Sequence, residues 1–248
     1  GGGGFNQAAQ DVYTQIRAAG VIIIAAAGND ASSQLGYPAS YEGVVSVSAA
    51  AHGSGGNPED AILASYSTFG TEVDVSAPGG QSFADNNNDG FNDGVLSTIG
   101  SDSCDEPGGY ATYNGTSMAT PHVAGVAALM ESVHAGLTPD EFDQALAERT
   151  IVLDIGDPGR DDLFGAGLIG CYLGGVLTSL GFNTQLICRT ATKAKLSHGI
   201  KLSDYQDHQQ TVANVTAIDD KRLMPHISEV KKARFLWLTV KCTGIEQA

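Results

Sequence analysis

NGTSMATPHVAGVAAL, residues 114–129, is a glycine-threonine-serine turn that leads directly into a helix with no charged side chain before Glu131. Pro121 is tolerated only near a helix start or at a kink, so it marks where this helix begins. The residues after His122 are apolar on every side, which predicts a helix buried through the core. Ser117 then stands at a helix start, where free backbone N–H groups and the helix dipole favour negative charge. This arrangement suits a nucleophilic hydroxyl held on a rigid element.

The segment GTSMATPHVAG, residues 115–125, resembles the nucleophile motif of the subtilisin-like serine endopeptidases, the subtilases. A serine-rich turn before a core helix explains most GTS tripeptides, but it does not explain a match of this length. The resemblance implies that Ser117 attacks a peptide carbonyl and that the partner is a polypeptide substrate. It also implies an α/β fold, with a mostly parallel sheet, helices on both faces and an incomplete N-terminal side.

An apolar run, VIIIAAA, occupies residues 21–27 and ends at Gly28. Such a run predicts a parallel strand that is buried on both faces. Catalytic groups gather at the carboxyl ends of strands in open α/β sheets. AAAGND, residues 25–30, resembles the subtilase segment whose asparagine donates its amide to the oxyanion of the tetrahedral intermediate. By this resemblance Asn29 is a neutral, fixed donor aimed at the developing charge.

The same resemblance assigns residues that contact the substrate. Ala26, Ala27 and Gly28 would line one wall of the specificity pocket. Gly1 and Gly2 would end a segment that pairs with the substrate as an edge strand. A plain flexible leader fits these two glycines nearly as well, so both alternatives stay open.

Further subtilase landmarks follow in the order of the family and end near residue 170. They include YPAS at residues 37–40, VSAPG at residues 75–79 and LFGAGLI at residues 163–169, which resembles the closing strand of the subtilase domain. We therefore expect residues 1–170 to form the carboxyl-terminal part of a subtilase catalytic domain. Residues 171–248 carry no recognised motif, and we expect a tail of unknown structure that is disordered or unrelated to the enzyme.

The run DNNNDGFND, residues 85–93, has the spacing at which a calcium-binding loop begins. Hard oxygen ligands alternate along it, and Gly90 permits a sharp turn. Leu96 stands where an EF-hand would place a bidentate glutamate, so one ligand would have to come from elsewhere or from water. We favour a structural calcium over a solvated acidic loop, which stays open as the alternative. The predicted ligands are Asp85, Asn87, Asp89 and Asp93, together with the carbonyl of Phe91.

Charge divides the chain at the same place as the motifs. Residues 1–170 contain 3 Lys and Arg against 22 Asp and Glu, whereas residues 171–248 contain 10 against 6. The acidic first part argues against a nucleic-acid partner and suits a secreted protein that binds cations. The chain begins with glycines and without Met. We therefore expect a fragment of a longer, secreted precursor that is a monomer when complete.

The stretch between Asp162 and Arg189 carries no charge and suggests a membrane span. The catalytic fold claims residues 163–169, however, which leaves too few apolar residues for a span. A shifted reading frame or a chance fusion also explains the tail and predicts poor order after about residue 185. Three of the four cysteines are in the tail, Cys104 is the fourth, and their pairing stays open.

Catalysis by Ser117 needs a histidine base that is itself oriented by an aspartate. In subtilases both precede the serine in the chain, and no histidine in this chain suits the role. His122 follows Ser117 within the same helix and is expected to be buried and structural. The chain alone is therefore predicted to be inactive, and to fold poorly because central strands are missing.

The alternative function is a non-catalytic calcium-binding or adhesion module derived from a protease. Retention of both Ser117 and Asn29 argues against this alternative, because binding alone needs neither residue.

Overall fold

The chain divides into two compact units, Gly1–Ile169 and Gly170–Ala248. The computed structural model describes residues 4–54, 60–86, 88, 90, 92–100 and 109–169 of the first unit. In the second unit it describes four strands, β7 Gln185–Cys188, β8 Ile200–Ser203, β9 Gln209–Val212 and β10 Thr216–Asp219. β7 pairs in parallel with β10, and β8 pairs antiparallel with β9.

Several positions singled out in the sequence lie outside the described residues. They are Gly1, Gly2, Asn87, Asp89, Phe91, Cys104 and most of the uncharged stretch, residues 170–184. Among the residues that are described, no helix combines the length and the apolar character that crossing a membrane requires.

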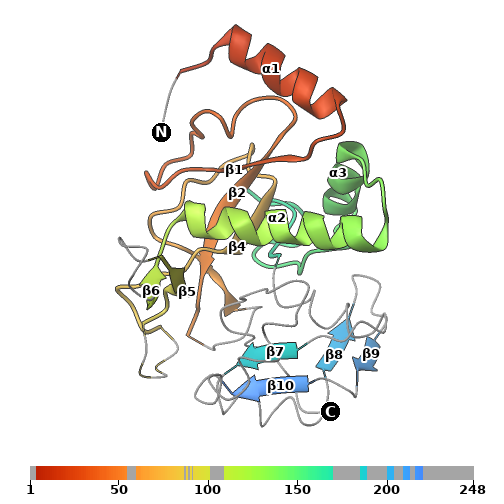
Figure 1. Cartoon of the computed structure of the whole chain (residues 1–248). Coiled ribbons are helices and arrows are strands. Elements are labelled where there is room, and N and C mark those ends of the chain that lie inside the picture. The colour runs from red at the N-terminus through yellow and green to blue at the C-terminus, as the bar shows by residue number, and fades with distance from the viewer. Residues whose placement is uncertain are drawn as a thin grey trace. The chain divides into compact units, whose positions relative to one another are not determined.

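A four-stranded sheet organises the first unit (Figure 1). Its central strand, β2, pairs in parallel with β1 and β4 and antiparallel with the short β3. Val47 of β2 pairs with Ala26 of β1 and with Val75 of β4, so β1 and β4 flank β2 on opposite edges. The expectation of a mostly parallel sheet is confirmed. The bounds of the strands are β1 Ile23–Ala26, β2 Val44–Ala51, β3 Ile62–Leu63 and β4 Val75–Pro78.

Helices cover both faces of this sheet. All eight residues of β2 are buried, which requires cover on either side. On one face, α1 (Gln7–Ala18) packs Ala9 and Tyr13 against a cluster that contains Ala25 and Val44. Alternate residues of β2 face the other way, and α2 (Thr116–Val133) lies against β1, β2 and β4 there (Figure 1). The architecture is therefore the α/β arrangement that the resemblance implied.

Two burial expectations are wrong in detail. Apart from Ala25, the residues of β1 are only half-buried, because β1 pairs with β2 alone among the described strands. α2 is buried along one side only: Val123 is inaccessible, whereas Ala124 and Ala128 are exposed. The helix tolerates this arrangement because each alanine methyl exposes little apolar area.

Side chains cap the N-termini of α1 and α3. The side chain of Asn6 accepts a hydrogen bond from the Ala9 N–H and caps α1. α3 (Pro139–Ala147) begins with a capping box in which Thr138 and Glu141 each accept the other's backbone N–H.

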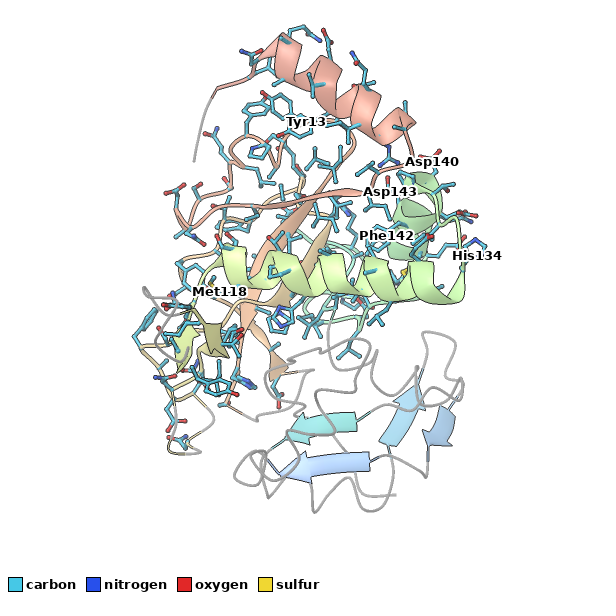
Figure 2. The ribbon with its side chains drawn as sticks, in the orientation of Figure 1. Tyr13, Met118, His134, Asp140, Phe142 and Asp143 are labelled. Atoms are coloured by element: carbon cyan, nitrogen blue, oxygen red, sulfur yellow. The ribbon has the colours of Figure 1, made fainter. Side chains whose placement is uncertain are left out.

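One arginine joins the first and third helices. A guanidinium nitrogen of Arg17 on α1 lies 2.6 Å from a carboxylate oxygen of Asp140 and 2.7 Å from one of Asp143, both on α3. Figure 2 shows these two aspartates on the side of α3 that faces the end of α1. Burial raises the pKa of the Asp143 carboxyl, and the charge of Arg17 opposes this rise.

The first unit is completed by a hairpin and by a closing segment. β5 (Val95–Ile99) and β6 (Gly109–Tyr113) pair antiparallel, and β6 leads into the turn before α2. Residues 163–169 form isolated bridges rather than a continuous strand: Gly165 bridges to Val75 and Leu168 bridges to Ser76. They nevertheless occupy the edge of β4.

We predict that Arg17→Ala lowers the free energy of unfolding by about 1 kcal/mol. The substitution removes the aliphatic stem and leaves the half-buried Asp143 without its partner, while an exposed ion pair by itself contributes only about 0–1 kcal/mol. Chemical denaturation measures this change. Asp140→Asn is the matched control and should change stability by less than about 0.5 kcal/mol, because its side chain is 92% exposed. Equal losses in the two variants would contradict the prediction.

Candidate active site

The carboxamide of Asn29 is fixed by the residue that opens α2. Its Oδ1 atom accepts the backbone N–H of Thr116 at 2.9 Å and the hydroxyl of Thr116, also at 2.9 Å. The Thr116 hydroxyl in turn accepts the N–H of Gly28 at 3.3 Å. Since both bonds hold the oxygen of the amide, the Nδ2 group points away from Thr116 and keeps its two donors for another partner. The loop after β1 is thus locked onto the start of α2.

Gly115 leaves a space between two hydrogen-bond donors. This residue has φ +150°, a backbone conformation that favours glycine. A Cβ built on it would lie 3.7 Å from Asn29 Nδ2 and 3.7 Å from the backbone nitrogen of Ser117. The volume that a side chain would fill is therefore bordered by both donors and, also at 3.7 Å, by the sulfur of Met118. The N-terminal turn of a helix favours negative charge.

Ser117 is exposed, and its position in the helix is unusual. It is the second residue of α2, where a backbone N–H has no partner four residues earlier. Pro121 lies four residues later and lacks the N–H that would bind the Ser117 carbonyl. Figure 2 shows the neighbouring Met118 at the end of α2 nearest the β5–β6 hairpin, with His134 at the opposite end. The serine hydroxyl thus stands at an accessible helix start, as the sequence predicted.

The turn before Ser117 is also held from β4. The N–H of Gly115 donates to the Gly79 carbonyl at 3.0 Å. The hydroxyl of Tyr66 reaches the carbonyls of Gly79 and Gly80 at 2.9 and 2.7 Å. Burial raises the pKa of Tyr66 to about 12, so this hydroxyl stays protonated and acts as a donor.

Sequence reasoning missed both supporting residues, Thr116 and Tyr66. Thr116 lies within the GTS motif and Tyr66 within the segment ASYS, residues 64–67, but the role of each hydroxyl depends on which group faces it in the folded chain.

Two histidines near α2 have contacts that do not involve Ser117. The ring of His122 is buried, and its Nδ1 lies 2.8 Å from the carbonyl oxygen of Met118 one turn earlier. Burial lowers the pKa of His122, so the ring is neutral at pH 7. His134 pairs instead with Glu141 at 3.4 Å. The expectation of a buried structural His122 is confirmed.

The predicted pocket wall and calcium loop are only partly described. Ala27 is buried and donates its N–H to Val47, whereas Ala26 and Gly28 are half-buried. In the loop, the Gly90 N–H donates to Asp85 Oδ2 at 2.9 Å and the Asn86 N–H donates to Asp93 Oδ2 at 2.6 Å. No group of three or more His, Cys, Asp or Glu in the described part of the chain could hold a metal ion.

Comparison with known proteins identifies the class of protein. The family model described as the subtilase family matches residues 1–167. An extracellular protease of Xanthomonas campestris pv. campestris is 43% identical over 150 residues, which are 59% of this chain and 22% of that protein. Subtilisin amylosacchariticus of Bacillus subtilis subsp. amylosacchariticus is 36% identical over 68% of this chain and 37% of its own length.

Solved structures agree with this comparison. A protease of Pseudoalteromonas arctica PAMC 21717 superimposes with a TM-score of 0.53 and 33% identity, over 68% of this chain and 46% of that one. A lanthipeptide protease gives a TM-score of 0.52 and 27% identity, over 66% of this chain and 52% of that one. The chain belongs to the subtilase family. It spans between 22% and 37% of the length of the curated relatives named above.

A second family model, ketopantoate reductase PanE/ApbA, matches residues 163–248. This match begins inside the closing segment of the first unit and covers all of the second unit.

We predict that His122 makes the fold sensitive to mild acid. Because burial lowers the folded-state pKa, the unfolded chain takes up a proton near pH 6.5 where the native ring does not. Stability is therefore full above pH 6.5 and falls as the pH drops below it, by at most about 1.4 kcal/mol per pH unit. In His122→Gln this contribution is absent, so the stability gap between the two proteins should narrow from pH 7 to pH 5. Calorimetry over this range measures the gap, and a gap independent of pH would refute the assignment.

Proposed function

We propose that the chain contributes the nucleophile and the oxyanion site of a secreted subtilisin-like serine endopeptidase. On this proposal residues 1–170 are the carboxyl-terminal part of the catalytic domain. The observation that supports it most directly is the pair of hydrogen bonds from Thr116 to Asn29 Oδ1, which directs the amide beside the start of α2. The family membership of residues 1–167 supports the same conclusion independently.

The proposed reaction begins with attack of the Ser117 hydroxyl on a peptide carbonyl. A new bond forms between Oγ and the carbonyl carbon, and the hydroxyl proton passes to a histidine base supplied by the complete enzyme. The carbonyl oxygen becomes an oxyanion that accepts hydrogen bonds from Asn29 Nδ2 and the Ser117 N–H. Collapse of the intermediate breaks the C–N bond, the histidine protonates the leaving amine, and water later releases the acyl group from Ser117.

Rigidity explains why these groups suit the reaction. The amide of Asn29 is already oriented before a substrate arrives, so donors need no rearrangement when charge develops on the oxygen. Gly115 leaves room for the oxygen between the donors. A binding module has no need for this preorganised pair. The alternative of a non-catalytic module therefore lacks a structural observation in its favour.

The names of the relatives support proposals for the substrate and for the cellular location of the protein. The substrate is a polypeptide, as the names of the protease relatives suggest, and the protein is secreted, as the Xanthomonas relative is named an extracellular protease. The acidic first part disfavours nucleic acid as a partner. We propose a monomeric enzyme, because both groups of the proposed oxyanion site, Ser117 and Asn29, come from one chain.

Labelling with a fluorophosphonate probe tests this function. In the complete enzyme, with its aspartate and histidine present, we expect stoichiometric modification at Ser117 and none in Ser117→Ala. The present chain alone should not be labelled, because no base activates the serine. An intact gene product that folds but resists the probe would favour the binding module.

We predict that Asn29→Ala lowers kcat of the complete enzyme by about 10²–10³-fold with little change in KM. This magnitude is the measured precedent for the corresponding donor in subtilisin itself, so we borrow it from a relative. Steady-state kinetics on a peptide substrate provides the measurement. Gln7→Ala, which removes an exposed amide on α1, is the matched control and should leave kcat unchanged. A large rise in KM with constant kcat would mean that Asn29 binds the ground state instead.

We also propose a structural calcium in the loop of residues 85–93, held by Asp85, Asn87, Asp89, Asp93 and the Phe91 carbonyl. One hydrogen bond and the burial of one carboxylate support it. The Gly90 N–H closes the loop onto Asp85, and Asp93 is 3% exposed, so its carboxylate is directed inward. Calcium would supply charge compensation for these carboxylates and brace the loop without taking part in the reaction.

Calcium should raise the melting temperature of the protein relative to a chelator, by the linkage of binding to folding. A saturation of 100-fold over Kd corresponds to about 2.7 kcal/mol. Asp93→Asn should abolish most of this shift, because it removes one negative ligand while keeping the shape of the side chain. Asp11→Asn, on the exposed face of α1, is the charge-matched control and should retain the shift. A calcium-independent melting temperature in the unmodified protein would rule out the site.

A further inference from the structure

Residues 165–170 read GAGLIG, which is the pattern G-x-G-x-x-G. In a βαβ unit this pattern forms the turn that holds the pyrophosphate of a dinucleotide, with glycines for the tight turn and for close approach of the ligand. Arg189 follows about 20 residues after Gly170 and directly after β7, where a dinucleotide-binding unit places the residue that contacts the ribose. An arginine there suits the 2′-phosphate of NADP(H). The match of residues 163–248 to a reductase family begins at this pattern.

The backbone of this segment has other partners in the first unit. A dinucleotide site needs backbone N–H groups that point freely at phosphate oxygens. The five N–H groups from Gly165 to Ile169 are all donated to carbonyl oxygens of the first unit. Gly165 donates to Asp161 at 3.1 Å, Ala166 to Asp74 at 2.8 Å, Gly167 to Phe164 at 3.0 Å, Leu168 to Leu153 at 2.8 Å and Ile169 to Ser76 at 2.9 Å.

The bare faces of the two described glycines are covered as well. Gly165 has φ +61°, and a Cβ built on it would lie 2.7 Å from the Val73 carbonyl oxygen and against the Asp74 carbonyl. Gly167 has φ +134°, and a Cβ there would lie against the carbonyl of Leu153. The glycines therefore permit the chain to approach β4 closely, and no room remains at these positions for a pyrophosphate.

The side chains of the same segment belong to the core of the first unit. Phe164 and Ala166 are each 3% exposed and Ile169 is inaccessible. Phe164 packs in a cluster with Ala50 of β2 and Ile155. Withdrawal of the segment would break the five hydrogen bonds and expose these apolar groups to water.

We propose that residues 164–169 could form part of either of two mutually exclusive folds, the subtilase domain or a dinucleotide-binding unit, and that in this chain they pack on the sheet of the subtilase domain. The phosphate-binding fingerprint at the start of the reductase match is used instead as the closing segment of the first unit. This chain consequently binds no NADP(H), although residues 163–248 match a reductase family. The tail is a piece of a dinucleotide-binding protein joined at a glycine-rich sequence that both folds can use.

Glycine substitutions test which fold holds the segment, with the whole chain as the sample. Gly165→Ala and Gly167→Ala should each lower the melting temperature of the first unit by several degrees, because both glycines have positive φ and touch backbone carbonyls. Gly109→Ala is the matched control: its nearest neighbour to a built Cβ is 3.9 Å away, and the melting temperature should not move. If the segment belonged to the tail, all three variants would have the melting temperature of the unmodified first unit, and the proposal would be overturned.

Amide hydrogen exchange with NADPH as the probe provides the second measurement. The amides of residues 165–169 should exchange as slowly as those of β4, and millimolar NADPH should leave these exchange rates unchanged. Addition of the protein should not change the fluorescence of NADPH. Slow exchange without binding supports the proposal. Saturable NADPH binding, or exchange at 165–169 as fast as in an unpaired loop, would overturn it. Neither result depends on Ser117 or Asn29, so a failure here leaves the proposed peptidase function standing.

Discussion

The locked contact between Asn29 and Thr116 is the interaction on which the first unit depends. It joins the carboxyl end of an edge strand to the first turn of the longest described helix through one amide oxygen that accepts two hydrogen bonds. The Gly28 N–H and the Thr116 hydroxyl close the same junction from the other side. Because the amide oxygen accepts both of these hydrogen bonds, the amide nitrogen points away from Thr116. The proposed function uses this nitrogen as the donor to the substrate oxygen.

Close backbone approach is the second constraint on this unit. Gly115 lies beside β4, its N–H bound to the Gly79 carbonyl, and Tyr66 holds the same turn through its hydroxyl. Gly165 and Gly167 bring the closing segment onto β4 in the same way. A single strand thus supports the turn before Ser117 at its end and the closing segment along its edge. The closing segment is also where the match to a second family begins, so the two folds compete for the same glycines.

Physical differences explain why some sequence expectations were confirmed and others were not. The buried, structural role of His122 is local, since its ring contacts the carbonyl of Met118 one turn earlier, and the structure confirms it. The burial of a strand is not local. β1 was expected to be buried on both faces, but burial depends on elements elsewhere in the chain; among the described strands only β2 pairs with it, so β1 lies at an edge of the sheet and is half-buried apart from Ala25. The one-sided burial of α2 is also decided by tertiary packing, because alanines occur on both sides of this helix and their pattern does not indicate which side packs against the sheet.

The sequence by itself determined the place of Ser117 at a helix start and the structural character of His122, because each depends on residues within one or two helical turns. It also determined the class of fold, through motifs that follow one another in the order of the family along residues 1–170. Tertiary structure alone decided which group orients Asn29 and which fold receives residues 164–169. Thr116 is 87 positions from Asn29, and Asp74 is 92 positions from Ala166, as their hydrogen bonds join them. Hydrogen-bond partners at such separations are chosen when strands align and helices pack, and no local pattern records that choice.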